Sequence, residues 1–139
     1  MSILPIYRKE IVITPEFLDE MHHVNNLWHV HWMQEAAREH SAANGWSVER
    51  YVEAGLAWFV RRHTINYLHP ILLNDVILVE TWVHELKNVS SIRQYRILRK
   101  SDGVELANGE TKWGMVNMET GRPTKVPPEL AAIFEEIRR

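Results

Sequence analysis

NNLWHVHWMQEAAREHSAANG, residues 25–45, differs in composition from the sequence around it. Trp, Met, Gln, Glu and several alanines replace the β-branched residues that are frequent elsewhere, which predicts a helix over residues 27–43. Asn25 or Asn26 can cap its start, because an Asn side-chain oxygen accepts a hydrogen bond from an unpaired backbone N–H. Gly45 stands where a C′ glycine ends a helix. At about 1.5 Å per residue, this helix spans roughly 25 Å, enough to cross a small domain.

The segments on either side of this helix have the composition of β-strands. A strand is predicted at residues 3–13, stopped at Thr14-Pro15, and a short helical connector at residues 48–55. Segments rich in Val, Ile, Thr, Tyr and Trp predict four more strands, at residues 57–68, 75–86, 90–100 and 104–118. The breaks between them are too short for crossover helices, so we expect antiparallel hairpins. A short amphipathic helix is predicted from Pro127-Pro128 to Arg139.

This order of elements predicts the α+β class. An antiparallel sheet of about five strands, wrapped around one long central helix, accounts for all of them in a single domain, residues 1–139. In residues 76–79, apolar side chains fall on both faces of the predicted strand. One helix covers only one side of a sheet, so the other side is expected to meet another subunit of a homo-oligomer.

The composition excludes several classes of protein. The chain has 139 residues, a formal net charge of −2 and no cysteine. Without cysteine there are no disulfides, thiolate zinc sites, Fe–S clusters or Cys nucleophiles, and a chain of this charge is not expected to bind nucleic acid. No segment approaches the ~20 apolar residues of a membrane helix, and no signal peptide is apparent, so we expect a cytoplasmic protein without a membrane partner.

Several common catalytic and metal motifs are absent from the sequence. There is no Gly-x-Ser-x-Gly, no Gly-x-Gly-x-x-Gly and no P-loop, which argues against an α/β-hydrolase, a dinucleotide site or an NTP site. His22 and His23 are adjacent and splay apart, and His29 and His31, two residues apart, do not share a helix face. We therefore expect neither a metal nor a cofactor.

Residues 19–26, DEMHHVNN, place two carboxylates, two imidazoles and two amides directly before the predicted helix. A helix N-terminus offers unpaired N–H groups and a partial positive charge, which polarise a carbonyl and stabilise an oxyanion. Asp19 could activate water as a general base or attack the carbonyl itself, and His23 could hold the carbonyl or orient the water. In the alternative interpretation these residues only form turns and helix caps.

The pattern Asp19-x-x-x-His23-Val24-Asn25-Asn26, followed after eight residues by Glu35, resembles the motif of hotdog-fold thioesterases. It is similar to the 4-hydroxybenzoyl-CoA/acyl-CoA thioesterase group and to the plant-type acyl-ACP thioesterases. The resemblance extends through most of the chain. Further matching segments are Ile65-x-Tyr67-x-x-Pro70 with Asp75, and residues 113–126 with Thr120-Gly121-Arg122-Pro123 and Val126-Pro127.

The resemblance implies a role for each matching residue. Asp19 matches the acidic residue regarded as general base or nucleophile. His23, Asn25 and Asn26 match the residues that position water and the thioester carbonyl. Glu35 matches a helical carboxylate of the acyl-ACP group; its alternative is a buried or interface-paired Glu.

Three positions depart from the family pattern. Met21 occupies the place of an Asn used by the plant acyl-ACP enzymes, which favours the acyl-CoA side. His22 stands where a Gly is usual, and His29 where the family usually has Tyr. The side chain of His22 puts the loop geometry in question.

Candidate substrate-binding residues lie further along the chain. Lys87, Asn88 and Ser90 fall in the hairpin that borders the acyl-CoA cleft in this family. Arg61 and Arg62 are adjacent in a strand, so one is expected on each face, where either could pair with a CoA phosphate or form a surface ion pair. Trp58, like Trp28 and Trp32, could line an acyl tunnel or belong to the core.

Together these observations predict an acyl-CoA thioesterase that releases free acid and CoA without a cofactor. The resemblance implies at least a homodimer, with the cleft formed between subunits, and leaves a homotetramer open. An acyl-ACP thioesterase and a non-catalytic acyl-binding hotdog protein remain alternatives. A hotdog dehydratase is disfavoured, because no Gly or Pro follows His23 before Gly45.

Overall fold

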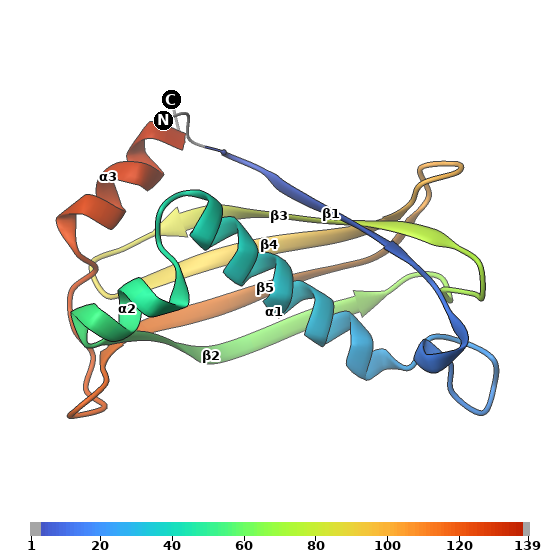
Figure 1. The fold of residues 1–139 in the computed structure, drawn as a ribbon, viewed down its shortest axis with the longest axis horizontal. Helices are drawn as coiled ribbons and strands as arrows, with labels where there is room; N and C mark the ends of the chain where they lie inside the picture. The colour runs from blue at the N-terminus through green and yellow to red at the C-terminus, as the bar shows by residue number, and fades with distance from the viewer. Residues whose placement is uncertain (1–3, 138–139) are drawn as a thin grey trace.

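The computed structural model describes residues 4–137 and confirms the α+β class (Figure 1). Five strands form one sheet, and one long helix, α1, lies across it (Figure 1). In chain order the elements are β1 (Tyr7–Val12), the 3-10 helix η1 (Pro15–Phe17), α1 (Asn26–Ala43), α2 (Val48–Ala54), β2 (Leu56–Tyr67), β3 (Val76–Leu86), β4 (Ser90–Arg99), β5 (Glu105–Asn117) and α3 (Pro128–Ile137).

The sheet has the strand order β1-β3-β4-β5-β2, and every neighbouring pair is antiparallel. The predicted hairpins between β3 and β4 and between β4 and β5 are confirmed. The prediction of a hairpin between β2 and β3 is wrong, because β2 pairs with β5 at the far edge of the sheet. The connection at residues 68–75 is long enough to pass two strands, since three strand spacings amount to only about 14 Å.

Most predicted boundaries agree with the structure to within one residue. The exception is the first strand, predicted at residues 3–13, because β1 begins only at Tyr7. Pro5, which has no N–H to donate to a ladder, lies in the segment before it. Residue 3 and residues 138–139, the end of the predicted last helix, lie outside the described part of the chain.

The core lies between α1 and the inner face of the sheet. Trp32, Met33 and Ala36 of α1 are buried there against Ile77 and Val79 of β3 and their neighbours. Gly109 of β5 makes this close packing possible. A Cβ at that position would lie 2.9 Å from the carbonyl oxygen of Thr64 and 3.3 Å from Sδ of Met33. Trp32 is thus a core residue.

The outer face of the sheet is more polar than the apolar side chains predicted for it from residues 76–79. Glu80 of β3 is 1% exposed and forms ion pairs with Arg8 of β1 and Arg96 of β4. A guanidinium nitrogen of Arg62 lies 3.6 Å from a carboxylate oxygen of Glu110 on the same face. The face therefore carries ion pairs across the strands as well as apolar side chains. Within residues 4–137, no helix combines the length and hydropathy needed to cross a membrane.

Candidate active site

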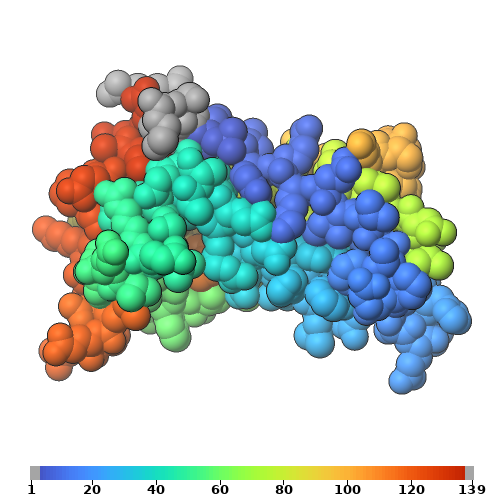
Figure 2. Space-filling view, viewed as in Figure 1, coloured from blue at the N-terminus to red at the C-terminus, as the bar shows by residue number. Residues whose placement is uncertain are grey.

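Asp19 and His23 form the two ends of a tight turn before α1. The backbone N–H of Asp19 donates to the carbonyl of His23 at 2.8 Å. In return, Oδ1 of Asp19 accepts from the N–H of Met21 at 2.8 Å and from the N–H of His23 at 3.2 Å. The turn thus holds the Asp19 carboxylate through one oxygen, while Oδ2 has no hydrogen-bond partner among residues 4–137. This segment protrudes at the end of the molecule opposite α2 and α3 (Figure 2).

His22 lies in this turn with a φ of 61°, in the left-handed region. Glycine adopts this conformation without strain, and Asn, Asp and His do so more readily than other residues. The position where the related motif has Gly therefore keeps the backbone conformation that Gly would adopt.

Asn25 caps the N-terminus of α1. Its Oδ1 accepts from the N–H of Leu27 at 2.9 Å, and its carbonyl accepts from the N–H of Trp28 at 3.0 Å. The predicted N-cap of this helix at Asn25 is therefore confirmed. The N–H of Asn26, the first residue of α1, has no acceptor within the described part of the chain, and it lies at the positive end of the helix dipole.

The connection between β2 and β3 holds this turn in place. The N–H of Val24 donates to the carbonyl of Ile71 at 3.0 Å, and His23 forms a bridge with Leu72. Oδ2 of Asp75 accepts from the N–H of Leu72 at 3.0 Å and so shapes the loop. This contact explains the presence of Asp75 in the motif; the sequence alone did not link it to His23.

His29 lies in the first turn of α1 and is buried. It is 3% exposed, and its ring meets that of Tyr67 edge-on, with centroids 4.9 Å apart. Burial lowers the pKa of His29, so its ring is neutral at physiological pH. His31 faces outward instead, with Nε2 3.3 Å from Glu35, which confirms that the two histidines do not share a face. Residues 4–137 contain no cluster of three potential metal ligands.

Glu35 does not join Asp19 in the structure. It lies nine residues beyond Asn26, about 13 Å along the helix axis, and pairs with Lys9 of β1. Lys9 also pairs with Glu39 at 2.6 Å. The hydrogen bond from Lys9 lowers the pKa of Glu35. Glu35 therefore faces the β1 side of the sheet as part of an ion-pair cluster.

Trp58 lies at the opposite end of β2 from the turn. Its Nε1 donates to the hydroxyl of Tyr51 at 3.0 Å, and it packs on a second apolar cluster that includes Trp46 and Met115. Along β2, Trp58 is about 30 Å from Tyr67, which contacts the start of α1. Trp58 is thus a partly buried residue far from Asp19 of its own chain.

Arg61 and Arg62 both lie on the outer face of the sheet, so the prediction of one on each face is wrong. The pairing register of β2 with β5 shifts between Val60 and Arg62, and such a bulge breaks the simple alternation of side chains. Arg61 folds over Gly114, where a Cβ would lie 2.7 Å from its Nε. Ser90 of β4 pairs with the same glycine, so Ser90 and Arg61 flank it.

Lys87 and Asn88 form the hairpin beside them. The ammonium of Lys87 is exposed, 3.7 Å from the Glu85 carboxylate, and the carbonyl of Asn88 accepts from the N–H of Val126 at 2.8 Å. The predicted substrate-binding residues thus gather at one end of the sheet. Asp19, His23, Asn25 and Asn26 gather at the other, so one chain does not bring the two groups together.

The chain belongs to the thioesterase-like superfamily, whose family profile matches residues 13–134. It has the hotdog fold of that superfamily, as the motifs predicted. It is 23% identical over 128 residues to the long-chain acyl-CoA thioesterase FadM of Escherichia coli, covering 92% of this chain and 96% of that one.

Two examples illustrate the many solved structures that share the fold. The protein SAV2348 of Staphylococcus aureus, determined in complex with CoA, superposes with a TM-score of 0.90 at 16% identity, covering 99% of this chain and 86% of that one. The 12:0-ACP thioesterase of Umbellularia californica superposes with a TM-score of 0.83 at 20% identity, covering 95% of this chain and 50% of that one.

Proposed function

We propose that the protein is an acyl-CoA thioesterase that hydrolyses an acyl thioester to the free acid and CoA. One observation carries the proposal. A carboxylate fixed through one oxygen, that of Asp19, lies at the same end of the molecule as the N–H of Asn26 at the start of α1, which has no acceptor among residues 4–137. A general base or nucleophile and an oxyanion donor are what thioester hydrolysis requires. The similarity to FadM and to a CoA-binding hotdog protein supports CoA as the carrier.

In the proposed reaction, Oδ2 of Asp19 accepts a proton from water as the water oxygen attacks the thioester carbon. In the alternative route Oδ2 attacks that carbon itself, and after CoA leaves, water hydrolyses the resulting mixed anhydride to the free acid and restores Asp19. The N–H of Asn26 stabilises the oxyanion, with His23 and the Asn26 side chain holding the carbonyl and the water. The C–S bond then breaks, and CoA leaves as a thiolate. A thiol pKa of about 8.5 makes this departure possible without a strong general acid.

Two of the predicted catalytic residues receive different roles. The side-chain oxygen of Asn25 is engaged with Leu27, so its role is to fix the start of α1 and thereby the oxyanion donor. Glu35 is engaged with Lys9 on the β1 side, so the proposal gives it no chemical step.

We further propose that two copies pair through β2 to complete the active site. β2 is a 12-residue edge strand, and residues 61–64 are all exposed. Antiparallel pairing of this strand with its copy places the Leu56 end of one strand beside the Tyr67 end of the other. Trp58, Arg61, Lys87, Asn88 and Ser90 of one protomer then lie at the Asp19 end of its partner, where the cations can meet the CoA phosphates. A light-scattering mass of one 16.4 kDa chain at micromolar concentration would contradict this pairing.

Thiol release from a panel of short, long and aromatic acyl-CoAs tests the proposed activity. Turnover of the short, the long or the aromatic acyl-CoAs identifies the substrate class. The cytoplasmic location that we expect is consistent with acyl-CoA substrates. Turnover of acyl-ACP alone would favour the acyl-ACP alternative. Tight acyl-CoA binding without turnover of any substrate would favour the non-catalytic acyl-binding alternative.

A further inference from the structure

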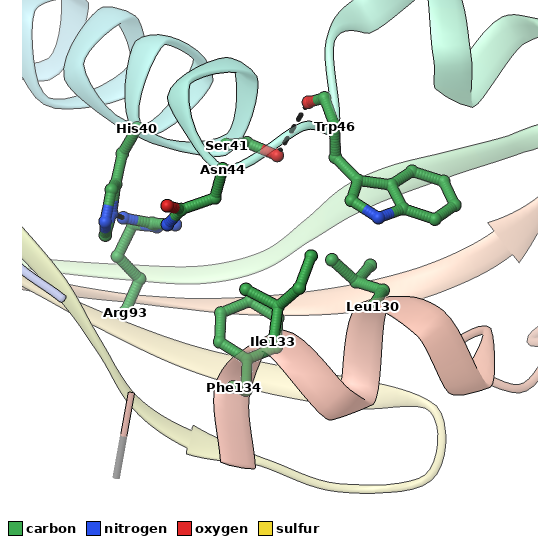
Figure 3. A pocket seen from close by; sticks show the side chains of 8 residues that line it. All are labelled: His40, Ser41, Asn44, Trp46, Arg93, Leu130, Ile133 and Phe134. Atoms are coloured by element: carbon green, nitrogen blue, oxygen red, sulfur yellow. Dashed lines mark hydrogen bonds between the residues drawn. The ribbon is translucent and has the colours of Figure 1, made fainter. Parts of the chain in front are cut away.

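Arg93 is a buried cation at the centre of the sheet. It lies in β4 on the inner face, is 6% exposed, and sits beneath the C-terminal turns of α1 (Figure 3). α3 approaches it from the other side, so the guanidinium is enclosed by three elements. Arginine is rarely buried to this extent unless an anion accompanies it.

One nitrogen of Arg93 is bound by neutral groups. Nη1 donates to Nδ1 of His40 at 2.9 Å and to the hydroxyl of Thr81 at 3.1 Å. Because Nδ1 of His40 accepts, its proton lies on Nε2, which donates to the carbonyl of Leu4 at 2.6 Å. Burial, with the nearby charge of Arg93, lowers the pKa of His40 to about 4. His40 is therefore neutral and leaves the charge of Arg93 uncompensated.

The other groups near Arg93 do not neutralise it either. Burial raises the pKa of Tyr51 and of Tyr95, so both phenols keep their protons. No carboxylate within residues 4–137 forms an ion pair with Arg93. The C-terminal end of α1 contributes a partial negative charge of about one half at most. The environment thus retains a net positive charge.

Arg93 lines a small pocket, and two of its three guanidinium nitrogens have no hydrogen-bond partner among residues 4–137. Nε and Nη2 have no acceptor within the part of the chain that the structure describes. Neither atom is fully enclosed by protein, so both keep some accessible surface. Arg93 lines the pocket together with residues of α1 and α3 (Figure 3). The full lining set is His40, Ser41, Asn44, Trp46, Arg93, Leu130, Ile133 and Phe134. The space inside has room for a single small particle.

We propose that this pocket binds a small monovalent anion of halide size, with chloride as the ligand. The donors are Nε and Nη2 of Arg93, and the apolar side chains of α3 close the site. The size of the pocket excludes phosphate and larger organic anions, whereas a water molecule would leave the buried charge unpaired. Because the anion contacts β4, α1 and α3 together, its binding stabilises the attachment of α3 to the sheet.

Thermal unfolding in chloride and in gluconate of equal ionic strength tests this site. We expect chloride to raise the Tm of the wild-type protein by about 3 °C or more. Arg93→Met should lose this difference between the two salts, whereas Arg38→Met, which removes an exposed arginine from α1, should keep it. An equal difference in all three proteins would show a general salt effect and overturn the proposal.

Crystals of the wild-type protein grown in bromide provide a test that does not depend on the folding of a variant. We expect an anomalous bromide peak within hydrogen-bond distance of Nε or Nη2 of Arg93. A water molecule alone at this position, in crystals that hold bromide elsewhere, would contradict the proposal.

Discussion

Asp19 and His23 are joined by two backbone-directed hydrogen bonds, one in each direction. The N–H of Asp19 donates to the carbonyl of His23 at 2.8 Å, and the N–H of His23 donates to Oδ1 of Asp19 at 3.2 Å. A carboxylate that accepts backbone N–H groups loses rotational freedom. It is therefore positioned before any substrate arrives, as efficient acid–base catalysis requires.

The backbone at His22 predicts the effect of a glycine there. His22→Gly removes the strain of a positive φ but increases the freedom of the unfolded chain, so we expect the free energy of unfolding to stay constant or to rise by up to about 1 kcal/mol. Glu20→Gly, at an exposed turn position without a positive φ, should lower it by about 0.5–1 kcal/mol. Urea unfolding measures both. Equal losses in the two variants would show that the left-handed conformation at His22 is not occupied.

The N-cap of α1 predicts a difference between two substitutions of Asn25. Asn25→Ala removes the acceptor for the N–H of Leu27 and should lower the free energy of unfolding by about 1 kcal/mol. Asn25→Asp keeps an acceptor and adds a negative charge at the helix N-terminus, so its stability should match or exceed that of the wild type. Urea unfolding at low salt distinguishes them, and two equally destabilised variants would contradict the capping role.

The lowered pKa of His40 predicts a loss of stability in acid. The unfolded chain binds a proton at His40 near pH 6.5, whereas the folded chain does so near pH 4, so protonation favours the unfolded state. This contribution is complete above pH 6.5 and falls by up to about 1.4 kcal/mol per pH unit as the pH drops toward 4. Urea unfolding between pH 7 and pH 4 measures the slope.

His40→Gln is the matched variant for this pH dependence. Gln can accept from Arg93 and donate to the carbonyl of Leu4, but it does not titrate. Its stability should therefore fall less steeply in acid than that of the wild type. The lowered pKa of His29 leaves a residual slope in both proteins. Identical slopes would contradict a neutral, buried His40.

The elements set by local sequence could be predicted, whereas those set by distant pairing could not. The start of α1 follows from the cap at Asn25 and the helix formers behind it, so its bounds agree with the prediction. The place of β2 at the edge depends on pairing with β5, and the bulge before Arg62 depends on that register. Neither feature can be predicted from the short segments that separate the strands in the sequence.

The candidate site shows the same division. Asp19 and His23 bond to each other, and Asn25 caps the helix two residues further on, so one short motif is sufficient to group them. The position of Glu35 depends on Lys9, which reaches it from a strand far away in sequence. Arg93 has a usable signal, because it lies on the same strand face as Ser91, Tyr95 and Ile97, which are all buried.

The proposed sharing of each active site between two protomers predicts that two defective protomers can restore activity together. A chain with Asp19→Asn lacks the proposed catalytic carboxylate, and a chain with Arg61→Ala and Lys87→Ala lacks the proposed cations for CoA. In a random mixture of the two, half of the dimers are mixed and each holds one intact site, so about a quarter of the wild-type activity should return. Thiol release at low acyl-CoA concentration, after the chains are refolded together, measures it. Activity no higher than the mean of the two parents would contradict a site shared across β2.

The most direct test of the account is thiol release by Asp19→Asn beside Glu35→Gln. Each substitution removes one carboxylate and changes the size of the side chain little. We predict that Asp19→Asn lowers kcat by about 100-fold or more, the usual contribution of a general base. Glu35→Gln should keep kcat within about threefold of the wild type, since Glu35 only pairs with Lys9 and its neighbours. Turnover that survives in Asp19→Asn and is lost in Glu35→Gln would move the chemistry to Glu35 and contradict the account.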